Sequence, residues 1–309
     1  MSEQPSRTSA PTGYVVVANA GAGSTELAAV SAAVARLAAE APTQLVWTEE
    51  PEECTDLVRG LDEDRQLVIA GGDGSIHLTL GIVVDLDRTD RPVGIIPLGT
   101  GNDFARNHDL PLDPVEAADV VIARNVGDID AMVLEATPAG GTPEKLMVAN
   151  NMHVGLGVRA ARTASNWKSA LKRFAYPAAT AYEGVQGETV ELTVTVDGDQ
   201  VWDGPLLAAL VLLGPSMGGG IEMVPDQRRD LDVVLVEPAD TDERASLVAA
   251  ALRGRVYDAD RAQHHHATTV TLAGRDGIEV NLDGEMLEFA SPVTLTHAPK
   301  AWKVFVPAG

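Results

Sequence analysis

The sequence predicts an α/β domain followed by a β-rich domain. Between residues 14 and 104, short and nearly continuous apolar runs alternate with segments of helical period, which is typical of a parallel sheet covered by helices on both faces. After about residue 130 the apolar period changes from about 3.6 to about 2, and Asp-Gly turns separate short strands. We therefore expect a doubly wound, mainly parallel α/β domain and then an antiparallel, sandwich-like β domain.

The first domain consists of four apolar runs and the helices between them. Ser24 is a suitable N-cap for a helix in which Leu27, Val30 and Val34 keep the helical period, and Pro51 opens a second helix. A third helix is expected over 76–84. The expected strands are "YVVVA", "QLVW", "QLVIA" and "VGII", at residues 14–18, 44–47, 66–70 and 93–96. Three strands end in small or polar sequences, "NAGAGS", "GGDGS" and "PLGTGND", and such strand ends form the floor of a ligand crevice.

The second domain shows the shorter period. "TVELTVTV" at 189–196 alternates before an Asp197-Gly198 turn, and "LLAALVLLG", "LDVVLVE" and several runs within 267–306 are further strands. Two helical stretches, around 167–182 and 242–253, interrupt them. We expect a disordered tail over 1–12, the α/β domain over 13–133 and the β-rich domain over 134–309, with the last strand returning towards the first domain.

Composition excludes some classes of function. The formal net charge is −22 and 45% of the residues are apolar, so the chain is globular and has no basic footprint for nucleic acid. The acidity fits either a high-salt cytoplasm or a GC-rich genome. Cys54 is the single cysteine, which excludes a disulfide framework. No apolar run reaches the roughly 20 residues of a membrane span, and we expect a cytoplasmic protein.

"GGDGS" at residues 71–75 follows a buried strand and precedes a helix. Consecutive backbone N–H groups at such a glycine turn, together with the positive end of the helix, can hold a phosphate. A glycine-rich turn is also a common connection between a strand and a helix that binds no ligand. The phosphate loop Gly-x-x-x-x-Gly-Lys-Ser/Thr is absent from the sequence, which disfavours a P-loop kinase.

"PLGTGNDFAR" at residues 97–106 is more specific, because "GGDGS" precedes it and "NLDGE" follows at 281–285. With these motifs in this order, the chain resembles the diacylglycerol kinase catalytic family of soluble bacterial lipid kinases, which also includes the sphingosine and ceramide kinases. The resemblance runs along the whole chain after the tail. Further segments that resemble the family are "GDIDAMVLE", "VANNMHVGLGVRA", "KRFAYPAATA", "LLGPSMGGG" and "PKAWKVFVP".

The resemblance implies a site for ATP and Mg²⁺ in a cleft between the two domains. Asp73 matches a family aspartate that is tied to magnesium and to catalysis, and Arg106 matches an arginine that contacts phosphate. The proline and serine of an early family element are missing after Asn19. The residues placed at the nucleotide are Asn19, Gly23, Gly71, Gly72, Gly74, Ser75, Gly99, Thr100, Gly101, Asn102 and Arg106.

"NLDGE" is also a common hairpin sequence, and the Asp197 turn is expected to be only that. Phosphoryl transfer needs a carboxylate near the acceptor hydroxyl and others near the phosphates through Mg²⁺. On a regular strand Asp283 and Glu285 would share a face. The resemblance makes Asp283 a base and Glu285 a magnesium ligand. Whether Asp73 or Asp283 takes the proton stays open.

The acceptor end of the cleft departs from the family pattern. The resemblance assigns it to Asp103, Asp130, His77 and Leu78. Leu78 stands where the family usually carries Glu, so the acceptor need not be diacylglycerol. Asp230 and Asp232 remain from a family Asp-Asp-Gly-x-Leu-Asp element that has lost its turn, which leaves a structural Mg²⁺ at these aspartates an open question.

Two further features have competing interpretations. Residues 159–174 carry five cations, and this stretch is either an interfacial helix that meets anionic lipid or an ordinary packed helix. His264, His265 and His266 suggest a metal site. Neighbouring side chains of an extended chain point to opposite sides, so at most two of the three histidines could share a face. A surface loop is therefore the favoured interpretation.

The leading hypothesis is an ATP-dependent lipid kinase that phosphorylates a hydroxyl of diacylglycerol or a related lipid, with Mg²⁺ and in-line transfer. One alternative is a kinase of a soluble small-molecule hydroxyl compound. The other is a nucleotide-binding regulator with impaired catalysis. The expected partner is the hydroxyl acceptor, with peripheral contact to an anionic inner membrane face and a homodimer both left open.

Overall fold

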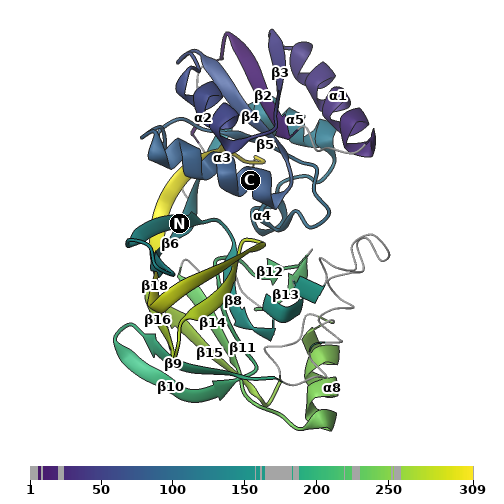
Figure 1. Ribbon diagram of the computed structural model, residues 1–309. Coiled ribbons are helices and arrows are strands. Elements are labelled where there is room, and N and C mark those ends of the chain that lie inside the picture. The colour runs from purple at the N-terminus through teal and green to yellow at the C-terminus, as the bar shows by residue number, and fades with distance from the viewer. Residues whose placement is uncertain are drawn as a thin grey trace. The chain divides into compact units, whose positions relative to one another are not determined.

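A computed structural model describes residues 6–7, 10–19, 24–156, 158–160, 162–163, 183, 188–218, 220–224, 230–251, 253 and 259–308. Gly23, most of the tail over 1–12 and the helix expected around 167–182 lie outside these ranges. The chain divides into two compact units (Figure 1). The first comprises Met1–Asp130 and Lys300–Gly309, and the second comprises Ala131–Pro299.

The first unit contains a four-stranded parallel sheet in the order β3-β2-β4-β5, which confirms the predicted α/β domain. Buried apolar side chains run almost unbroken through its strands, because helices cover both faces. The strands are β2 (Gly13–Asn19), β3 (Thr43–Thr48), β4 (Arg65–Gly71) and β5 (Gly94–Pro97). The helices are α1 (Ser24–Ala38), α2 (Pro51–Arg59), α3 (Asp73–Asp85), α4 (Asp103–Asn107) and α5 (Pro114–Ala123).

Each face of this sheet has its own helix pair. Helices α1 and α5 contact each other and the sheet, and their side chains Val30, Leu37 and Val121 pack on Val16 and Ile96. Helices α2 and α3 contact each other, and they contact β3 and β4 respectively. The sheet is therefore wound on both sides, as the sequence predicts.

A late segment of the chain completes the first unit. Val304 forms a parallel bridge with Val93, and the N–H of Val306 donates to the carbonyl of Asn125 at 2.8 Å. Trp302, which is 2% exposed, donates its indole N–H to the carbonyl of Leu80 at 3.2 Å. Residues 300–306 thus belong to the fold of the glycine-rich loops, although they follow the whole second unit.

The second unit is antiparallel, as predicted. Its main path is β10-β9-β16-β18-β17-β8-β11-β14-β15, and every pair along it is antiparallel. These strands are β8 (Asn151–Gly155), β9 (Val190–Val196), β10 (Asp199–Leu206), β11 (Ala208–Leu212), β14 (Leu231–Val236), β15 (Ala262–Ala267), β16 (Thr269–Gly274), β17 (Ile278–Leu282) and β18 (Glu285–Phe305). The same sheet includes β6 (Asn125–Pro138) and β7 (Glu144–Val148), and β12 (Ser216–Met217) and β13 (Ile221–Glu222) form a small separate sheet. Strand β1 (Ser6–Arg7) belongs to the first unit and pairs with Asn125 and Val126 at the start of β6.

Side chains of β11 and β14 alternate between two apolar clusters, and β8 contributes Met152 and Val154 to the first of them. Met152, Val211 and Val233 belong to the main core, whereas Leu210 and Val234 belong to a second cluster on the opposite face. That second cluster also contains side chains of the small β12-β13 sheet and of helix α8 (Thr241–Ala251). Both faces are therefore buried along these strands.

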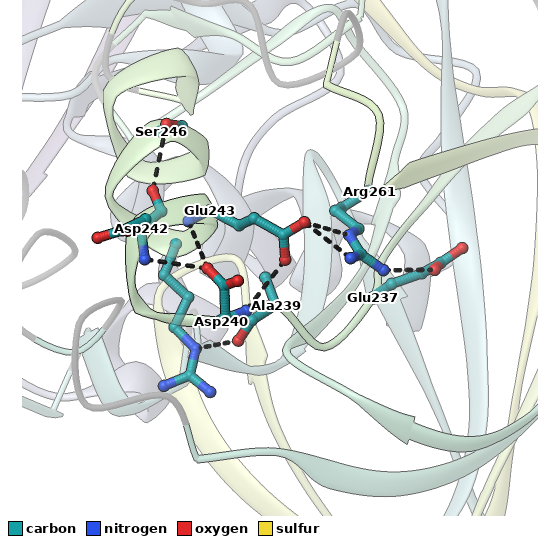
Figure 2. Close-up of polar contacts among 8 residues, drawn as sticks. Glu237, Ala239, Asp240, Asp242, Glu243, Ser246 and Arg261 are labelled. Carbon is teal, nitrogen blue, oxygen red and sulfur yellow. Dashed lines mark hydrogen bonds and ion pairs between the residues drawn. The ribbon is translucent and has the colours of Figure 1, made fainter.

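A capping box fixes the start of α8 (Figure 2). Asp240 accepts hydrogen bonds from the N–H groups of Asp242 and Glu243 at 3.1 and 3.0 Å, while Glu243 accepts from the N–H of Asp240 at 3.1 Å. Arg261 donates to the other Glu243 oxygen at 2.8 Å and lies 3.9 Å from Glu237. The hydrogen bond from Arg261 lowers the pKa of Glu243. This network ties the helix to the ends of β14 and β15.

The three adjacent histidines lie on β15, so the interpretation as a surface loop is wrong. His264 and His266 are exposed on one face and His265 is half-buried on the other, which agrees with the expected alternation. Polar residues can form this strand because β15 is at the edge of the sheet path, paired only with β14 along it.

Candidate functional site

Two glycine-rich loops of the first unit touch each other through their backbones. They follow β4 and β5, which are neighbouring parallel strands, and the N–H of Leu98 donates to the carbonyl of Gly71 at 2.9 Å. A Cβ atom on Gly99 would lie 2.7 Å from the Cα of Gly72, and one on Gly72 would lie 3.0 Å from the Cα of Gly99. The contact requires glycine at both positions, so "GGDGS" and "GTGN" form one structure.

Glycine is required at Gly71 for a different reason. A Cβ there would lie 2.5 Å from the Cβ of Ser75, which packs directly over it. Gly74 is different, because a Cβ on it would meet no atom within 4 Å and the residue is exposed. Gly74 therefore leaves open space at the first turn of α3.

The N-terminus of α3 has the properties of an anion site. Its N-cap is Gly72, which provides no side-chain hydrogen bond to the first N–H groups of the helix. These groups have no intrahelical partner and carry the positive end of the helix dipole. Because the open space at Gly74 adjoins them, an anionic group could approach the backbone N–H groups closely.

The predicted residues Asp73, Asn102 and Arg106 gather at the "GTGN" turn. Asp73 accepts a hydrogen bond from the N–H of Phe104 at 2.9 Å, so its carboxylate caps α4. Asn102 has left-handed backbone angles and donates to the carbonyl of Gly99 at 2.8 Å, while its buried Oδ1 has no hydrogen-bond partner among the described residues. Arg106 is exposed, and its Nε donates to the carbonyl of Gly101 at 3.0 Å.

The acidic residues assigned to the acceptor end take different positions in the first unit. Asp103 is buried at the start of α4. Asp130 is half-buried and accepts from the N–H of Lys300 at 2.8 Å. Desolvation lowers the pKa of His108 to about 4, against the opposing charge of Asp130. Leu78, on α3, is 37% exposed, so the residue that departs from the family pattern is accessible.

The Gly72–Gly99 contact predicts a loss of stability in Gly99→Ala. The new methyl group would overlap the Gly72 backbone and lie 2.9 Å from Asn102 Oδ1, so one loop must move. We expect the free energy of unfolding to fall by about 1–3 kcal/mol, measured by urea denaturation. Gly81→Ala is the matched control, since a Cβ on Gly81 meets no atom within 4 Å and alanine favours the helix. Equal stability of the two variants would contradict the contact.

Asp283 and Glu285 do not lie on one regular strand, and the expected shared face is therefore wrong. Asp283 and Gly284 form the two-residue turn between β17 and β18, with φ of 48° and 100°. Asp283 is 8% exposed, and its carboxylate accepts from the N–H groups of residues 149, 150 and 151 at 2.6, 2.8 and 2.9 Å. Glu285 is exposed and pairs with Leu282.

Asp230 and Asp232 do not form a metal cage in the described part of the chain. Asp232 is buried, and its Oδ1 lies 2.9 Å from Nδ1 of His266. Asp230 has a buried Oδ1 without a hydrogen-bond partner among the described residues. No group of three or more His, Cys, Asp or Glu in these ranges could hold a metal ion.

The cationic segment is described only at its start. Arg159 donates to the carbonyl of Glu188 at 2.6 Å and lies 4.0 Å from Glu183. Arg162 forms an ion pair with Glu279. These two cations therefore have partners within the protein, and the remainder of 164–174 lies outside the described residues.

The structure brings together most of the predicted nucleotide residues in the first unit. Asn19 is at the end of β2, next to β4, and Thr100 is exposed in the second glycine loop. His77 is half-buried on α3. Sequence reasoning missed His153, which is 3% exposed and whose Nδ1 has no hydrogen-bond partner among the described residues. A polar residue inside the otherwise apolar "MHVG" was the available signal.

Family models match both units. The diacylglycerol kinase catalytic domain matches residues 13–134, and the YegS C-terminal NAD kinase beta sandwich-like domain matches residues 150–306. The chain belongs to the diacylglycerol kinase catalytic family. The matching model is that of a kinase catalytic domain and the relatives are named kinases, which supports a phosphotransferase of a family that uses a nucleotide.

Relatives of this diacylglycerol kinase family member agree with the assignment. The protein named diacylglycerol kinase of Staphylococcus carnosus is 28% identical over 235 residues, covering 74% of this chain and 72% of its own length. That of Staphylococcus haemolyticus is 29% identical over 251 residues, covering 79% and 72%.

Solved structures share the fold. A putative diacylglycerol kinase from Bacillus anthracis has a TM-score of 0.77 at 20% identity and 99% coverage of both chains. Yeast NADH kinase in complex with NADH has a TM-score of 0.56 at 11% identity, covering 97% of this chain and 84% of its own. Among the described residues, no helix of this family member is long and apolar enough to cross a membrane.

Proposed function

We propose that the protein is an ATP-dependent lipid kinase that phosphorylates a hydroxyl of diacylglycerol or a related lipid. The observation that carries the nucleotide site is the backbone contact between Gly72 and Gly99, beside the uncapped start of α3 and the open space at Gly74. This arrangement suits the phosphates of ATP, because the first N–H groups of α3 have no side-chain cap and no atom lies within 4 Å of the Cβ position of Gly74. The names of the Staphylococcus relatives support a lipid acceptor.

The chemistry is in-line phosphoryl transfer. The acceptor oxygen forms a bond to the γ-phosphorus, the bond from that phosphorus to the β-γ bridging oxygen breaks, and ADP leaves. The hydroxyl proton goes to a carboxylate of the protein. Arg106, exposed next to the second glycine loop, would contribute positive charge to a protein that is strongly acidic overall.

Mg²⁺ fits the carboxylates that are present. It usually binds proteins through one or two carboxylates and takes its other oxygens from phosphates and water. In the first unit the residue that would hold it is Asp73, which is half-buried in the first glycine loop. In the second unit the candidate ligand is Glu285, which is exposed after the Asp283 turn. When bound, Mg²⁺ supplies neutralisation of the phosphate charge.

Gly74→Ala tests the nucleotide site without disturbing the fold. Its methyl group would enter open space, so the melting temperature should not fall. The same methyl group would occupy the space proposed for a phosphate, and we expect the KM for ATP to rise about tenfold, which corresponds to about 1.4 kcal/mol. Gly81→Ala, also in open space on α3, should leave the KM unchanged. An unchanged KM in both variants would exclude phosphate binding at Gly74.

An acceptor screen tests the substrate class. ATP consumption is measured with diacylglycerol, ceramide, sphingosine and undecaprenol in mixed micelles and with soluble polyols. Turnover of a lipid alcohol supports the proposal. Turnover of polyols alone would favour the soluble-substrate kinase, for which the exposed Leu78 on α3 is the motivating observation. Binding of ATP without any turnover would favour the regulator.

A further inference from the structure

Two Asp-Gly hairpins of the second unit have the same construction. The N–H of Asp197 donates to the carbonyl of Thr269 at 2.9 Å, and the N–H of Asp283 donates to the carbonyl of Asn151 at 3.0 Å. In both cases the acceptor is the first residue of the neighbouring strand, β16 or β8. Each aspartate carboxylate then accepts backbone N–H groups at the entry of that strand. For Asp197 these are the N–H groups of Thr268 and Thr269, at 3.0 and 2.8 Å.

The carboxylate of Asp283 accepts three backbone hydrogen bonds, whereas that of Asp197 accepts two. Oδ2 of Asp283 accepts from Ala149, and its Oδ1 accepts from Asn150 and Asn151. The Asp283 side chain is buried, whereas Asp197 is exposed. A buried carboxylate is tolerated only when hydrogen bonds replace its hydration, and here three backbone donors do so. Protonation would remove the negative charge to which these three N–H groups donate, and would therefore weaken the hydrogen bonds that hold residues 149–151.

The segment that Asp283 holds is polar and buried. Asn150 is 3% exposed, and its Oδ1 has no hydrogen-bond partner among the described residues. On the other side of the turn, Glu285 begins β18 with an exposed carboxylate. One carboxylate thus fixes a buried hydrogen-bond acceptor and a proposed magnesium ligand at the same time.

We propose that Asp283 is a positioning residue, which holds residues 149–151 and the hairpin that presents Glu285, and that it does not accept the proton of the substrate hydroxyl. The activity part of this proposal rests on the proposed kinase function. The turn geometry stands on its own, because the Asp197 hairpin repeats it away from the residues assigned to the reaction.

Asp283→Asn separates the two roles. An amide keeps an oxygen that can accept from Asn150 and Asn151, but it cannot act as a base and it opposes the Ala149 N–H. For a positioning residue we expect kcat to fall by no more than about tenfold, with the acidic limb of the pH–rate profile in place, because loss of a general base costs about 10²–10⁴-fold. Asp283→Ala removes all three bonds and should lower both the melting temperature and kcat/KM further. Asp197→Asn is the matched control and should leave kcat unchanged.

Two results would overturn the proposal. One is a loss of about 10³-fold in kcat for Asp283→Asn, with the acidic limb gone and the melting temperature unchanged. The other is unchanged amide hydrogen exchange both at Ala149 in Asp283→Asn and at residues 149–151 in Asp283→Ala, where the proposal requires faster exchange. If the wild-type protein phosphorylates no hydroxyl acceptor, the kinase proposal fails by itself, and the exchange measurement still decides whether Asp283 holds this segment.

Discussion

Asp73→Asn is expected to lower the turnover number by about 10³-fold or more while the melting temperature stays close to that of the wild type. The amide oxygen can still accept the hydrogen bond from Phe104 N–H, so the cap of α4 is kept. The variant lacks the negative charge that is needed to bind Mg²⁺ or to accept the proton of the substrate hydroxyl. Turnover of the lipid acceptor and thermal melting are measured on the same preparation.

Asp113→Asn is the matched control for Asp73→Asn. Asp113 caps α5 in a similar way, accepting from the N–H groups of Val115 and Glu116 at 2.9 and 3.1 Å. It is not among the residues proposed for the reaction, so its amide variant should keep full turnover. Unchanged turnover in Asp73→Asn would remove Asp73 from the reaction and leave it as a helix cap only.

Stability is expected to fall by about 3 kcal/mol between pH 6.5 and pH 4 on account of His153. Burial lowers the pKa of His153 from 6.5 to about 4, and the charge of Asp283 opposes this shift only in part. Below pH 6.5 the imidazole of His153 therefore binds a proton in the unfolded chain, whereas in the folded protein it stays neutral until about pH 4. The loss is complete near the folded pKa and absent above the unfolded one.

Urea denaturation at pH 7, 5.5 and 4.5 measures this dependence, with His153→Asn as the comparison. The variant has no group to titrate at this position, and His108, whose pKa is shifted in the same direction, is present in both proteins. The wild type should lose more stability than the variant as the pH falls. Parallel curves would show that His153 does not remain neutral in the fold.

The parallel sheet was predictable because its strands are buried on both faces and read as continuous apolar runs. The loop "GGDGS" was identified by its glycines, yet its close contact with Gly99 depends on β4 and β5 being neighbours, which is a tertiary fact. Helix α4 spans only five residues, Asp103–Asn107, and is too short to show a period.

The Asp283 turn shows where local sequence is insufficient. Asp197-Gly198-Asp199 and Asp283-Gly284-Glu285 are almost the same tripeptide, and the local signal for a hairpin is equal in both. The two turns differ in their N–H donors. The donors to the Asp283 carboxylate are residues that lie 132 to 134 positions earlier in the chain. The strand of His264 was missed because its polar side chains resemble a loop, and only pairing with β14 makes it a strand.

The place of residues 300–306 in the first unit has a consequence for synthesis on the ribosome. Asp130 accepts its hydrogen bond from Lys300, 170 positions later, and Trp302 is buried against a carbonyl of α3. All of the second unit emerges before residues 300–306, so the first unit acquires the contacts of these residues only after the second unit has been synthesised. A nascent chain arrested before Lys300 would therefore contain the whole second unit, while the first unit would still lack the Val304 bridge to Val93 and the buried Trp302 contact.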